Sequence, residues 1–345
     1  MPSRNPTQTL ASGKVKVYHV DLLPYDDARS PRLSADAKQL AMVCVIDRPN
    51  VKNAVDRETA LALHSAFVAF AHDPTLRVAI LTGANETFCA GADLKSISQS
   101  SLMGSSSNEG KAEATQSNPL DADMDAVAPM GVTRLAMNKP VIAAVEGFAV
   151  AGGMELALWA DLRVASSEAA FGILCRLRGV PLIDGGTVRL PALIGGSRAA
   201  DLALTGRLIS ATEAHAIGLV NYVVSSPKYD EPGGKSGFSA VVEKSLQIAA
   251  GLAANPQSCM LNDRASMLNA LYQGAKGEET EAEAEAGGKV DLRLKGGLRK
   301  AMEKEFELGL QSLAMLFEEG KVGAFVNRSS QQREADRAKS RASNL

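Results

Sequence analysis

Short apolar runs that predict buried strands alternate along the first half of the chain with segments whose apolar residues recur at helical spacing. The runs LAMVCVID at 40–47 and VAILT at 78–82 are typical of strands that are buried on both faces. Between them, residues 57–72 have the three- and four-residue spacing of an amphipathic helix. Further strands are predicted at 14–20, 141–145 and 162–165, and a helix at 152–159. This alternation predicts an α/β fold.

The length and composition of the chain disfavour several classes of protein. The 345 residues are enough for one large domain, or for one domain with an appendage. A net charge of −2 disfavours a nucleic-acid-binding protein, and no apolar run approaches the roughly 20 residues that span a bilayer. The four cysteines form no CxxC pair and the four histidines lack ligand spacing, so we expect no metal site and no disulfide framework. Scattered thiols of this kind fit a reducing compartment.

Several segments depart from the α/β pattern. Residues 98–125 are rich in Ser, Gly, Asn and Asp, which predicts a mobile loop insertion that could cover a site. We expect residues 1–14 to be a flexible N-terminal arm, 15–225 the core and 238–345 a helical C-terminal region with an amphipathic helix at 298–316. A basic N-terminus permits a mitochondrial transit peptide, and the tail SNL is similar to the peroxisomal signal SKL. Mitochondrial, cytoplasmic and peroxisomal locations therefore stay open.

The first segment with chemical content is TFCAGADLK at 87–95, which follows the predicted strand 78–82. Its triplet Ala90-Gly91-Ala92 has small side chains, so backbone N–H groups can point at a ligand. Many ordinary turns share this composition, and a turn with no ligand is the alternative.

The second segment is VEGFAVAGGMELAL at 145–158, in which Gly152 and Gly153 open a helix after a strand. A helix N-terminus offers unpaired N–H donors and a partial positive charge, which together stabilise an oxyanion. Glu155 lies three residues after Gly152, on the same side of the first turn, where a general acid or base could act. The alternative is a Glu that only complements the helix dipole.

Taken together and in this order, these segments resemble the crotonase, or enoyl-CoA hydratase/isomerase, superfamily. The resemblance extends over roughly 15–327, apart from the insertions at 98–125, 226–237 and 277–288. It includes VIDRPN (45–50), CAGADLK (89–95), NKPVIAAVEG (138–147), AGGMELA (151–157), GVPLIDGGT (179–187), LTGRLISATEA (204–214) and GLVN (218–221). It implies a core of repeated ββα units forming a spiral, a helical C-terminal trimerisation region, and a homotrimer or a hexamer built as a dimer of trimers.

The resemblance also assigns roles to residues. The amides of Ala92 and Gly152 would form an oxyanion hole for the carbonyl of an acyl-CoA thioester, with Glu155 as the acid or base. Coenzyme A would be bound by Ala90, Asp93, Leu94, Lys95, Phe325 and Arg328. Alternatively, Lys95 and Arg328 could be ordinary surface charges, and Phe325 could be an aromatic residue of the core. No separate cofactor is implied, because coenzyme A is part of the substrate.

One position departs from the family pattern. Hydratases of this family use a second glutamate about 20 residues after the first, and Cys175 stands there. The resemblance implies an acyl-CoA-processing enzyme of the hydratase/isomerase type, with three possibilities open. Glu155 acts alone or with the Cys175 thiol, or Glu155 and Asp184 together move a double bond as in dienoyl-CoA isomerases, or the protein binds acyl-CoA without catalysis. Asp184 could instead be a turn residue before Gly-Gly, and Cys175 a small buried hydrophobic residue.

Overall fold

The computed structural model describes residues 5–25, 33, 39–93, 120–225, 237–272 and 291–318 of the chain. Its centre is a seven-stranded sheet in the order β1-β2-β3-β4-β5-β7-β10. The three strands at the β1 edge pair antiparallel, and those from β3 to β10 run parallel. The bounds are Gln8–Leu10 (β1), Val15–Asp21 (β2), Leu40–Ile46 (β3), Leu76–Gly83 (β4), Val141–Val145 (β5), Leu162–Ser166 (β7) and Tyr222–Val224 (β10).

A second sheet has three strands, in the order β6-β8-β9, which come from segments between strands of the large sheet. Its strands are Phe148–Val150 (β6), Ala170–Gly172 (β8) and Leu208–Ser210 (β9). β6 follows β5 after a turn of two residues and leads directly into α3, so this small sheet sets where that helix begins.

Helices separate and follow these strands along the chain. They are α1 (Arg57–His72), α3 (Gly152–Trp159), α4 (Gly186–Ile194), α5 (Gly196–Thr205), α6 (Ala211–Ala216), α7 (Ala240–Ala254), α8 (Gln257–Tyr272) and α9 (Gly296–Glu318). Short 3-10 turns span Ala11–Gly13, Leu23–Tyr25, Pro49–Val51 and Leu174–Arg178. In the ranges that the structure covers, no helix combines the length and apolarity that crossing a membrane requires.

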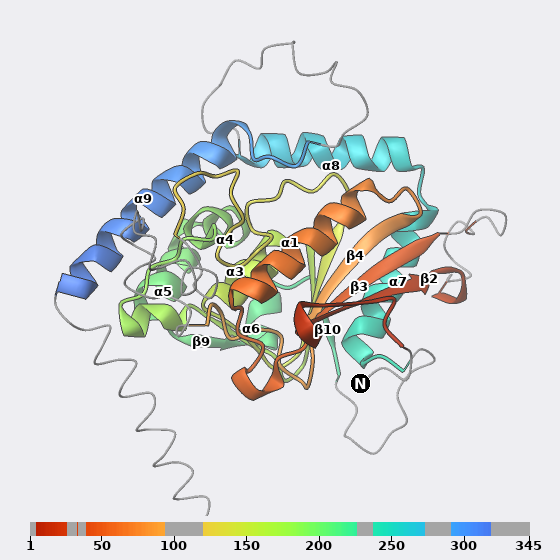
Figure 1. The fold of residues 1–345 in the computed structure, drawn as a ribbon, viewed down its shortest axis with the longest axis horizontal. Coiled ribbons are helices and arrows are strands. Elements are labelled where there is room, and N and C mark those ends of the chain that lie inside the picture. The colour runs from red at the N-terminus through yellow and green to blue at the C-terminus, as the bar shows by residue number, and fades with distance from the viewer. Residues whose placement is uncertain are drawn as a thin grey trace, which may run out of the picture.

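The large sheet is buried on both faces, which explains why its parallel strands read as continuous apolar runs. On one face, Phe67 and Phe70 of α1 pack with the β3 side chains Met42 and Cys44. On the other face, α7 packs against the alternate side chains of β3, β4 and β5. Figure 1 shows α1 in front of the strands and α7 behind them. Figure 1 also shows α8 and α9 following one edge of the molecule, where α9 reaches α4.

The strands and helices predicted from periodicity are confirmed. The helices predicted at 57–72 and 152–159 have the bounds of α1 and α3, and the helix predicted at 298–316 lies inside α9. α1 begins where predicted because the carboxylate of Asp56 accepts a hydrogen bond from the amide of Thr59. Of the predicted loop 98–125, residues 98–119 lie outside the described residues, whereas Leu120 and Met124 are buried.

The ends of the chain differ from expectation. Part of the flexible arm expected at 1–14 is the edge strand β1, because Gln8–Leu10 finds hydrogen-bonding partners along β2. The helical region expected from 238 begins inside the core, since α7 covers one face of the sheet. Because α7 covers apolar side chains of the strands, the region from 238 is part of the same hydrophobic core and not a separate domain.

Asn53 connects the ends of two parallel strands. Its Oδ1 accepts from the amide of Arg48, after β3, at 2.9 Å. Its Nδ2 donates to the carbonyls of Ala84 and Thr87, after β4, at 2.8 and 2.5 Å. The residue is fully buried and has a φ of 57°, a conformation that Asn tolerates better than most residues. Asn53 therefore positions the start of the chain segment that contains Ala90–Asp93.

We expect Asn53→Ala to lower the free energy of unfolding by about 2–4 kcal/mol, because it leaves buried backbone groups without partners. Denaturant unfolding measures this. Asn85→Ala is the matched control, because Asn85 also has a positive φ of 53° but is exposed, so only the smaller cost of backbone strain applies. Equal losses in the two variants would contradict the role of the Asn53 side chain.

Candidate active site

The turn at Ala90–Asp93 is held by hydrogen bonds on two sides. On one side, the amide of Cys89 donates to the carbonyl of Phe148 and the carbonyl of Cys89 accepts from Val150, at 2.9 and 3.1 Å. On the other side, Val55 donates to the Gly91 carbonyl and accepts from the amide of Asp93, at 2.9 and 2.8 Å. The backbone of the turn is therefore fixed against β6 and against the segment that precedes α1.

The start of α3 lies against this turn at very short range. A Cβ atom at Gly153 would stand 2.0 Å from the carbonyl oxygen of Cys89, so only glycine allows the approach. The residue before the helix, Ala151, has φ 53° and ψ −128°, and its amide donates to the carbonyl of Gly172 at 2.9 Å. Such strained conformations occur in functional sites where the surrounding structure fixes them.

This approach brings two backbone amides together. A Cβ atom at Gly152 would lie 3.3 Å from the amide nitrogen of Ala92, and one at Gly91 would lie 3.0 Å from the amide nitrogen of Gly152. Within the described residues, neither Ala92 nor Gly152 donates its amide hydrogen to an acceptor. Two adjacent free donors, one at a helix N-terminus, can bind an oxyanion. The structure thus brings together the two residues predicted to form the oxyanion hole.

Glu155 lies on the first turn of α3 and is only 4% exposed. Its Oε1 accepts hydrogen bonds from the amides of Asp184 and Gly186, both at 2.9 Å. Burial raises the pKa of Glu155 well above its usual value, and the charges of Asp184 and Glu305 raise it further, while the two amide hydrogen bonds oppose the rise. Glu155 is therefore more easily protonated than an ordinary glutamate, as a proton-transfer group near neutral pH should be.

Asp184 is a second buried carboxylate at the same place. Its Oδ1 accepts from the amide of Met130 at 3.1 Å and from the hydroxyl of Thr133. Burial raises the pKa of Asp184, and the hydrogen bond from Thr133 and the charge of Arg134 oppose that rise. Within the described part of the chain, Glu155 Oε2 and Asp184 Oδ2 accept no hydrogen bond. Each carboxyl group therefore keeps one oxygen for a substrate or a water molecule.

Cys175 lies on the 3-10 turn Leu174–Arg178 and is half-buried. Burial and the neighbouring charge of Glu155 raise the pKa of the Cys175 thiol to about 12. At neutral pH the Cys175 side chain is therefore a thiol and not a thiolate. Arg176, which could have lowered the pKa more strongly, directs its Nε to the carbonyl of Ala203 instead. Cys175 can donate a proton or pack as a thiol, but it is a poor base.

Glu305 of α9 was not identified from the sequence and completes the cluster of buried carboxylates. Its Oε2 accepts from the amide of Gly185 at 2.5 Å, and its Oε1 accepts from the amide and hydroxyl of Thr187, both at 2.7 Å. Glu305 thus holds the N-terminus of α4, the same turn whose amides hold Glu155. In the sequence, Glu305 could have been noticed as a charged residue next to Phe306, on the apolar face of the predicted helix, and both residues are buried.

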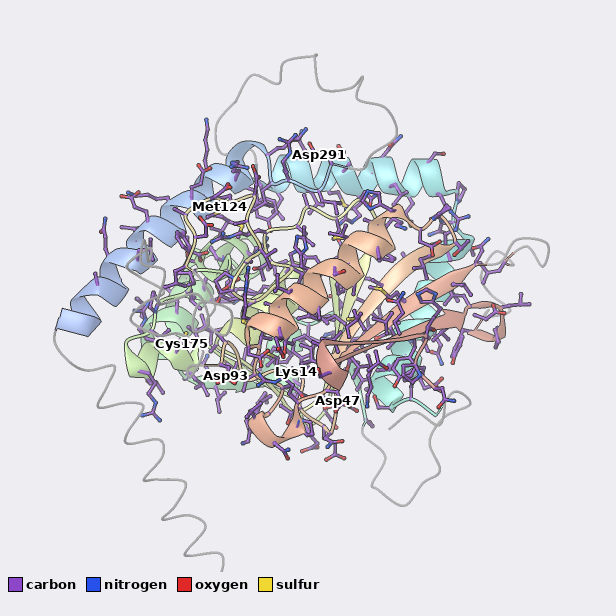
Figure 2. The ribbon with its side chains drawn as sticks, viewed as in Figure 1. Lys14, Asp47, Asp93, Met124, Cys175 and Asp291 are labelled. Atoms are coloured by element: carbon purple, nitrogen blue, oxygen red, sulfur yellow. The ribbon has the colours of Figure 1, made fainter. Side chains whose placement is uncertain are left out.

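The predicted coenzyme A residues are only partly described. The amide of Ala90 donates to the carbonyl of Lys52 at 3.0 Å, and the carboxylate of Asp93 pairs with Arg48 at 3.1 Å. Figure 2 shows Asp93 and Cys175 in the lower left of the molecule. The remaining predicted coenzyme A residues, Leu94, Lys95, Phe325 and Arg328, lie outside the described residues. In the ranges that the structure covers, no cluster of three or more His, Cys, Asp or Glu could hold a metal ion.

Comparison with known proteins identifies the family. A sequence model of the enoyl-CoA hydratase/isomerase family matches residues 37–232, and the chain belongs to this family. The α/β architecture is the crotonase fold that the sequence predicts, as shown by similar solved structures. One of them, a carnitinyl-CoA hydratase from Mycobacterium avium, has a TM-score of 0.61 and 26% identity, covering 91% of this chain and 96% of that one.

Two relatives with names that describe an activity are similar in sequence. Carnitinyl-CoA dehydratase of Proteus mirabilis is 40% identical over 184 residues, which are 53% of this chain and 64% of that protein. Mevalonyl-coenzyme A hydratase of Beauveria bassiana is 35% identical over 227 residues, which are 66% of this chain and 75% of that protein. The chain therefore matches just under two thirds of the length of the dehydratase.

We expect Glu305→Ala to lower the free energy of unfolding by about 2–4 kcal/mol, because it leaves the Gly185 and Thr187 donors without an acceptor. At a temperature where the variant is folded, we also expect kcat for crotonyl-CoA to fall by roughly 10- to 100-fold, since the turn that holds Glu155 shifts. Substrate affinity should change little. Glu303→Ala, at an exposed position of the same helix, is the control. An unchanged kcat in the Glu305 variant would leave Glu305 with a purely structural role.

A second prediction concerns pH. The pKa of Glu155 in the folded chain lies above its value of about 4.3 in the unfolded chain. The free energy of unfolding therefore falls as the pH rises from about 4.3 through the pKa of the folded state. Glu155→Gln removes this loss and keeps an oxygen that accepts from Asp184 and Gly186. We expect its melting temperature to exceed that of wild type near pH 8 and to match it near pH 4, as measured by calorimetry. A difference that is the same at both pH values would contradict the raised pKa.

Proposed function

We propose that this protein is an enzyme of the enoyl-CoA hydratase/isomerase type that acts on an acyl-CoA thioester. The observation that carries the proposal is the pair of adjacent amides at Ala92 and Gly152, which find no acceptor among the described residues, together with buried Glu155 on the first turn of the same helix as Gly152. The names of the two relatives, a carnitinyl-CoA dehydratase and a mevalonyl-coenzyme A hydratase, support it, because both describe addition or loss of water on a coenzyme A thioester.

The two amides supply the electrostatic part of the chemistry. Negative charge develops on the thioester oxygen when a proton leaves the α-carbon or when a nucleophile adds to the β-carbon. Donors that are already in place before the reaction stabilise this charge by about 3 kcal/mol each, because they need no reorganisation. The turn at Ala90–Asp93 and the start of α3 are held by backbone hydrogen bonds and by close packing, so the donors are preorganised.

Glu155 and Asp184 supply the proton transfer. Ionising both carboxyl groups is costly because burial raises the pKa of each and the charge of Asp184 raises the pKa of Glu155 further, so one proton is favoured on the pair. In hydration, the ionised member would take a proton from water while the protonated member delivers one to the α-carbon. Asp184 would thus take the role of the family's second glutamate, whose position in this chain is occupied by Cys175.

A second candidate reaction is double-bond isomerisation by the same pair. It is favoured by the closeness of the two residues: the backbone amide of Asp184 donates to Glu155 Oε1 at 2.9 Å, and the charge of Asp184 raises the pKa of Glu155. One carboxylate would remove a proton from one carbon and the pair would return it two carbons away, without water. Both reactions use no cofactor apart from the coenzyme A of the substrate.

We also propose that the chain assembles as a homotrimer or as a hexamer of two trimers. Apolar side chains at the surface, including Leu177 and Leu204, are 63% and 74% exposed. An interface between copies of the chain would cover such surface.

We expect Glu155→Gln to reduce turnover of crotonyl-CoA by roughly 10²- to 10⁴-fold, because the side chain keeps its shape but cannot transfer a proton. Binding of a saturated thioester, hexanoyl-CoA, should remain close to that of wild type, as measured by calorimetry. Glu168→Gln, at an exposed position, is the control and should keep full activity. Retained turnover in the Glu155 variant would refute the proposed role.

The products in deuterated water then distinguish the reactions. Crotonyl-CoA and a 3-enoyl-CoA are incubated with wild type and with Asp184→Asn and are analysed by mass spectrometry and NMR. A 3-hydroxyacyl product indicates hydration, whereas a shifted double bond with incorporated deuterium indicates isomerisation. We expect Asp184→Asn to slow whichever reaction occurs. Binding of both thioesters without any product would instead support an acyl-CoA-binding protein without catalysis.

A further inference from the structure

Arg189 is a buried cation on α4, next to the cluster of buried carboxyl groups. The helix contacts both α3, which carries Glu155, and α9, which carries Glu305 (Figure 1). Arg189 is only 4% exposed, so its charge is held inside the protein. Charged side chains are almost never buried to this degree unless other groups compensate the charge.

The guanidinium of Arg189 is held by two backbone carbonyls. Its Nη1 donates to the carbonyl of Asp184 at 3.0 Å, and its Nη2 donates to the carbonyl of Thr133 at 2.7 Å. Nη2 also lies 3.5 Å from the sulfur of Met302. A Cβ atom at Gly185 would overlap Nη1, so the guanidinium occupies the space that glycine leaves. Arg189 therefore joins the turn at Asp184 to the segment that carries Thr133.

These bonds fix Asp184 through its backbone and through its side chain. Its amide donates to Glu155 Oε1 at 2.9 Å, while its carbonyl accepts from Arg189. The hydroxyl of Thr133 donates to Asp184 Oδ1, and the carbonyl of the same threonine accepts from Arg189. Because Arg189 holds both Asp184 and the residue that orients its carboxyl group, it sets how Asp184 lies relative to Glu155.

Arg189 makes no ion pair with a carboxylate among the described residues. A guanidinium bonded directly to a carboxylate would occupy the oxygens that proton transfer needs. Because Arg189 bonds the carbonyl of Asp184 instead, it supplies positive charge and leaves Oδ2 of that residue without a hydrogen bond.

The charge of Arg189 acts on the whole cluster. Burial lowers the pKa of Arg189, and this is opposed by Tyr272 and by the carboxyl groups of Glu305, Glu155 and Asp184. Burial also raises the pKa values of Asp184 and Glu305, and the charge of Arg189 is among the effects that lower them. Arg189 stays a cation at neutral pH, because a guanidinium does not lose its proton in proteins.

The other groups near the cluster do not replace this charge. Arg134 is the second buried cation there, but it also faces the exposed carboxylates of Asp121 and Asp123. Burial raises the pKa of the Cys175 thiol to about 12 and also raises the pKa of the Tyr272 phenol, so both side chains are neutral near pH 7. Of the two buried cations, only Arg189 acts on all three carboxyl groups.

We propose that Arg189 is a positioning residue of the active site, which holds the backbone of Asp184 and supplies the positive charge that keeps a carboxylate of the cluster ionised. The inference rests on the proposed function, because a general base must be ionised before it takes a proton. Without this charge, a second proton on the cluster would be favoured. The cluster would then keep its acid and lose its base.

Infrared spectroscopy of the free protein tests the charge, because the C=O stretch of a protonated carboxyl group is separate from the bands of carboxylates. We expect Arg189→Met to show an additional protonated-carboxyl band at pH 7 relative to wild type. Arg189→Lys should not, since the ammonium group keeps the charge. Arg198→Met, at an exposed position of α5, is the control and should match wild type. The band requires no turnover, so it is measured whether or not the proposed reaction occurs.

The pH dependence of kcat for crotonyl-CoA tests the consequence for catalysis. We expect its acid limb to move to higher pH by about one unit in Arg189→Met, because the carboxylate base is protonated more readily. In Arg189→Lys the limb should stay near its wild-type position. The plateau should still fall by roughly tenfold in that variant, because an ammonium group lacks the fork that spans the two carbonyls. A merely structural role would lower kcat in both variants without moving the limb.

If Arg189→Met does not fold, Arg189→Gln replaces it, because the amide group donates hydrogen bonds but carries no charge. Adding Glu305→Gln removes one carboxylate along with the cation and should return the band to its wild-type intensity. The proposal is overturned if the folded neutral variant shows no additional band, if Arg189→Lys shows the same band, or if the acid limb does not move. An additional band in a protein that turns over no thioester would support the charge of Arg189 and refute the proposed reaction.

Discussion

The contact on which the candidate active site depends is between the carbonyl of Cys89 and the Cα atom of Gly153. No side chain could exist at Gly153 with this geometry, since its Cβ would overlap the carbonyl oxygen. Because the contact joins the end of the β4 segment to the start of α3, it places the amides of Ala92 and Gly152 side by side. β6 supports the contact by hydrogen bonds to both sides of Cys89. The proposed oxyanion site is thus formed by backbone amides, and the Asn53 side chain helps to position the segment that contains one of them.

A second constraint is the burial of three carboxyl groups near one turn. Glu155, Asp184 and Glu305 come from three separate elements, and Glu155 and Glu305 both bind amides of residues 184–187. Burial of charge without compensation is strongly unfavourable, so these amide donors are needed to keep the carboxyl groups inside. The same burial raises the pKa values of all three groups and suits two of them to proton transfer. Stability near neutral pH is therefore lower than it would be with amides in their place.

Much of this arrangement could be predicted from the sequence, because its parts are local. The helix at Gly152, the turn at Ala90–Asp93 and the position of Glu155 follow from short motifs with a clear physical meaning. The role of Glu305 could not be predicted, since its partners are about 120 positions away. The strands of the small sheet were also missed, because three residues are too few to show a period. For Cys175, the pKa could not be predicted from the sequence, because burial and the charge of Glu155 raise it more than the neighbouring Arg176 lowers it.

Infrared difference spectroscopy of bound hexanoyl-CoA, with carbon-13 at the thioester carbonyl, tests the oxyanion hole most directly. The isotope isolates the carbonyl stretch from the protein background. We predict that the stretch moves to lower wavenumber on binding to wild type and to Glu155→Gln alike, because the amides of Ala92 and Gly152 polarise the bond in both. A carbonyl stretch that stays at its solution position, for a thioester that calorimetry shows to be bound, would contradict this assignment.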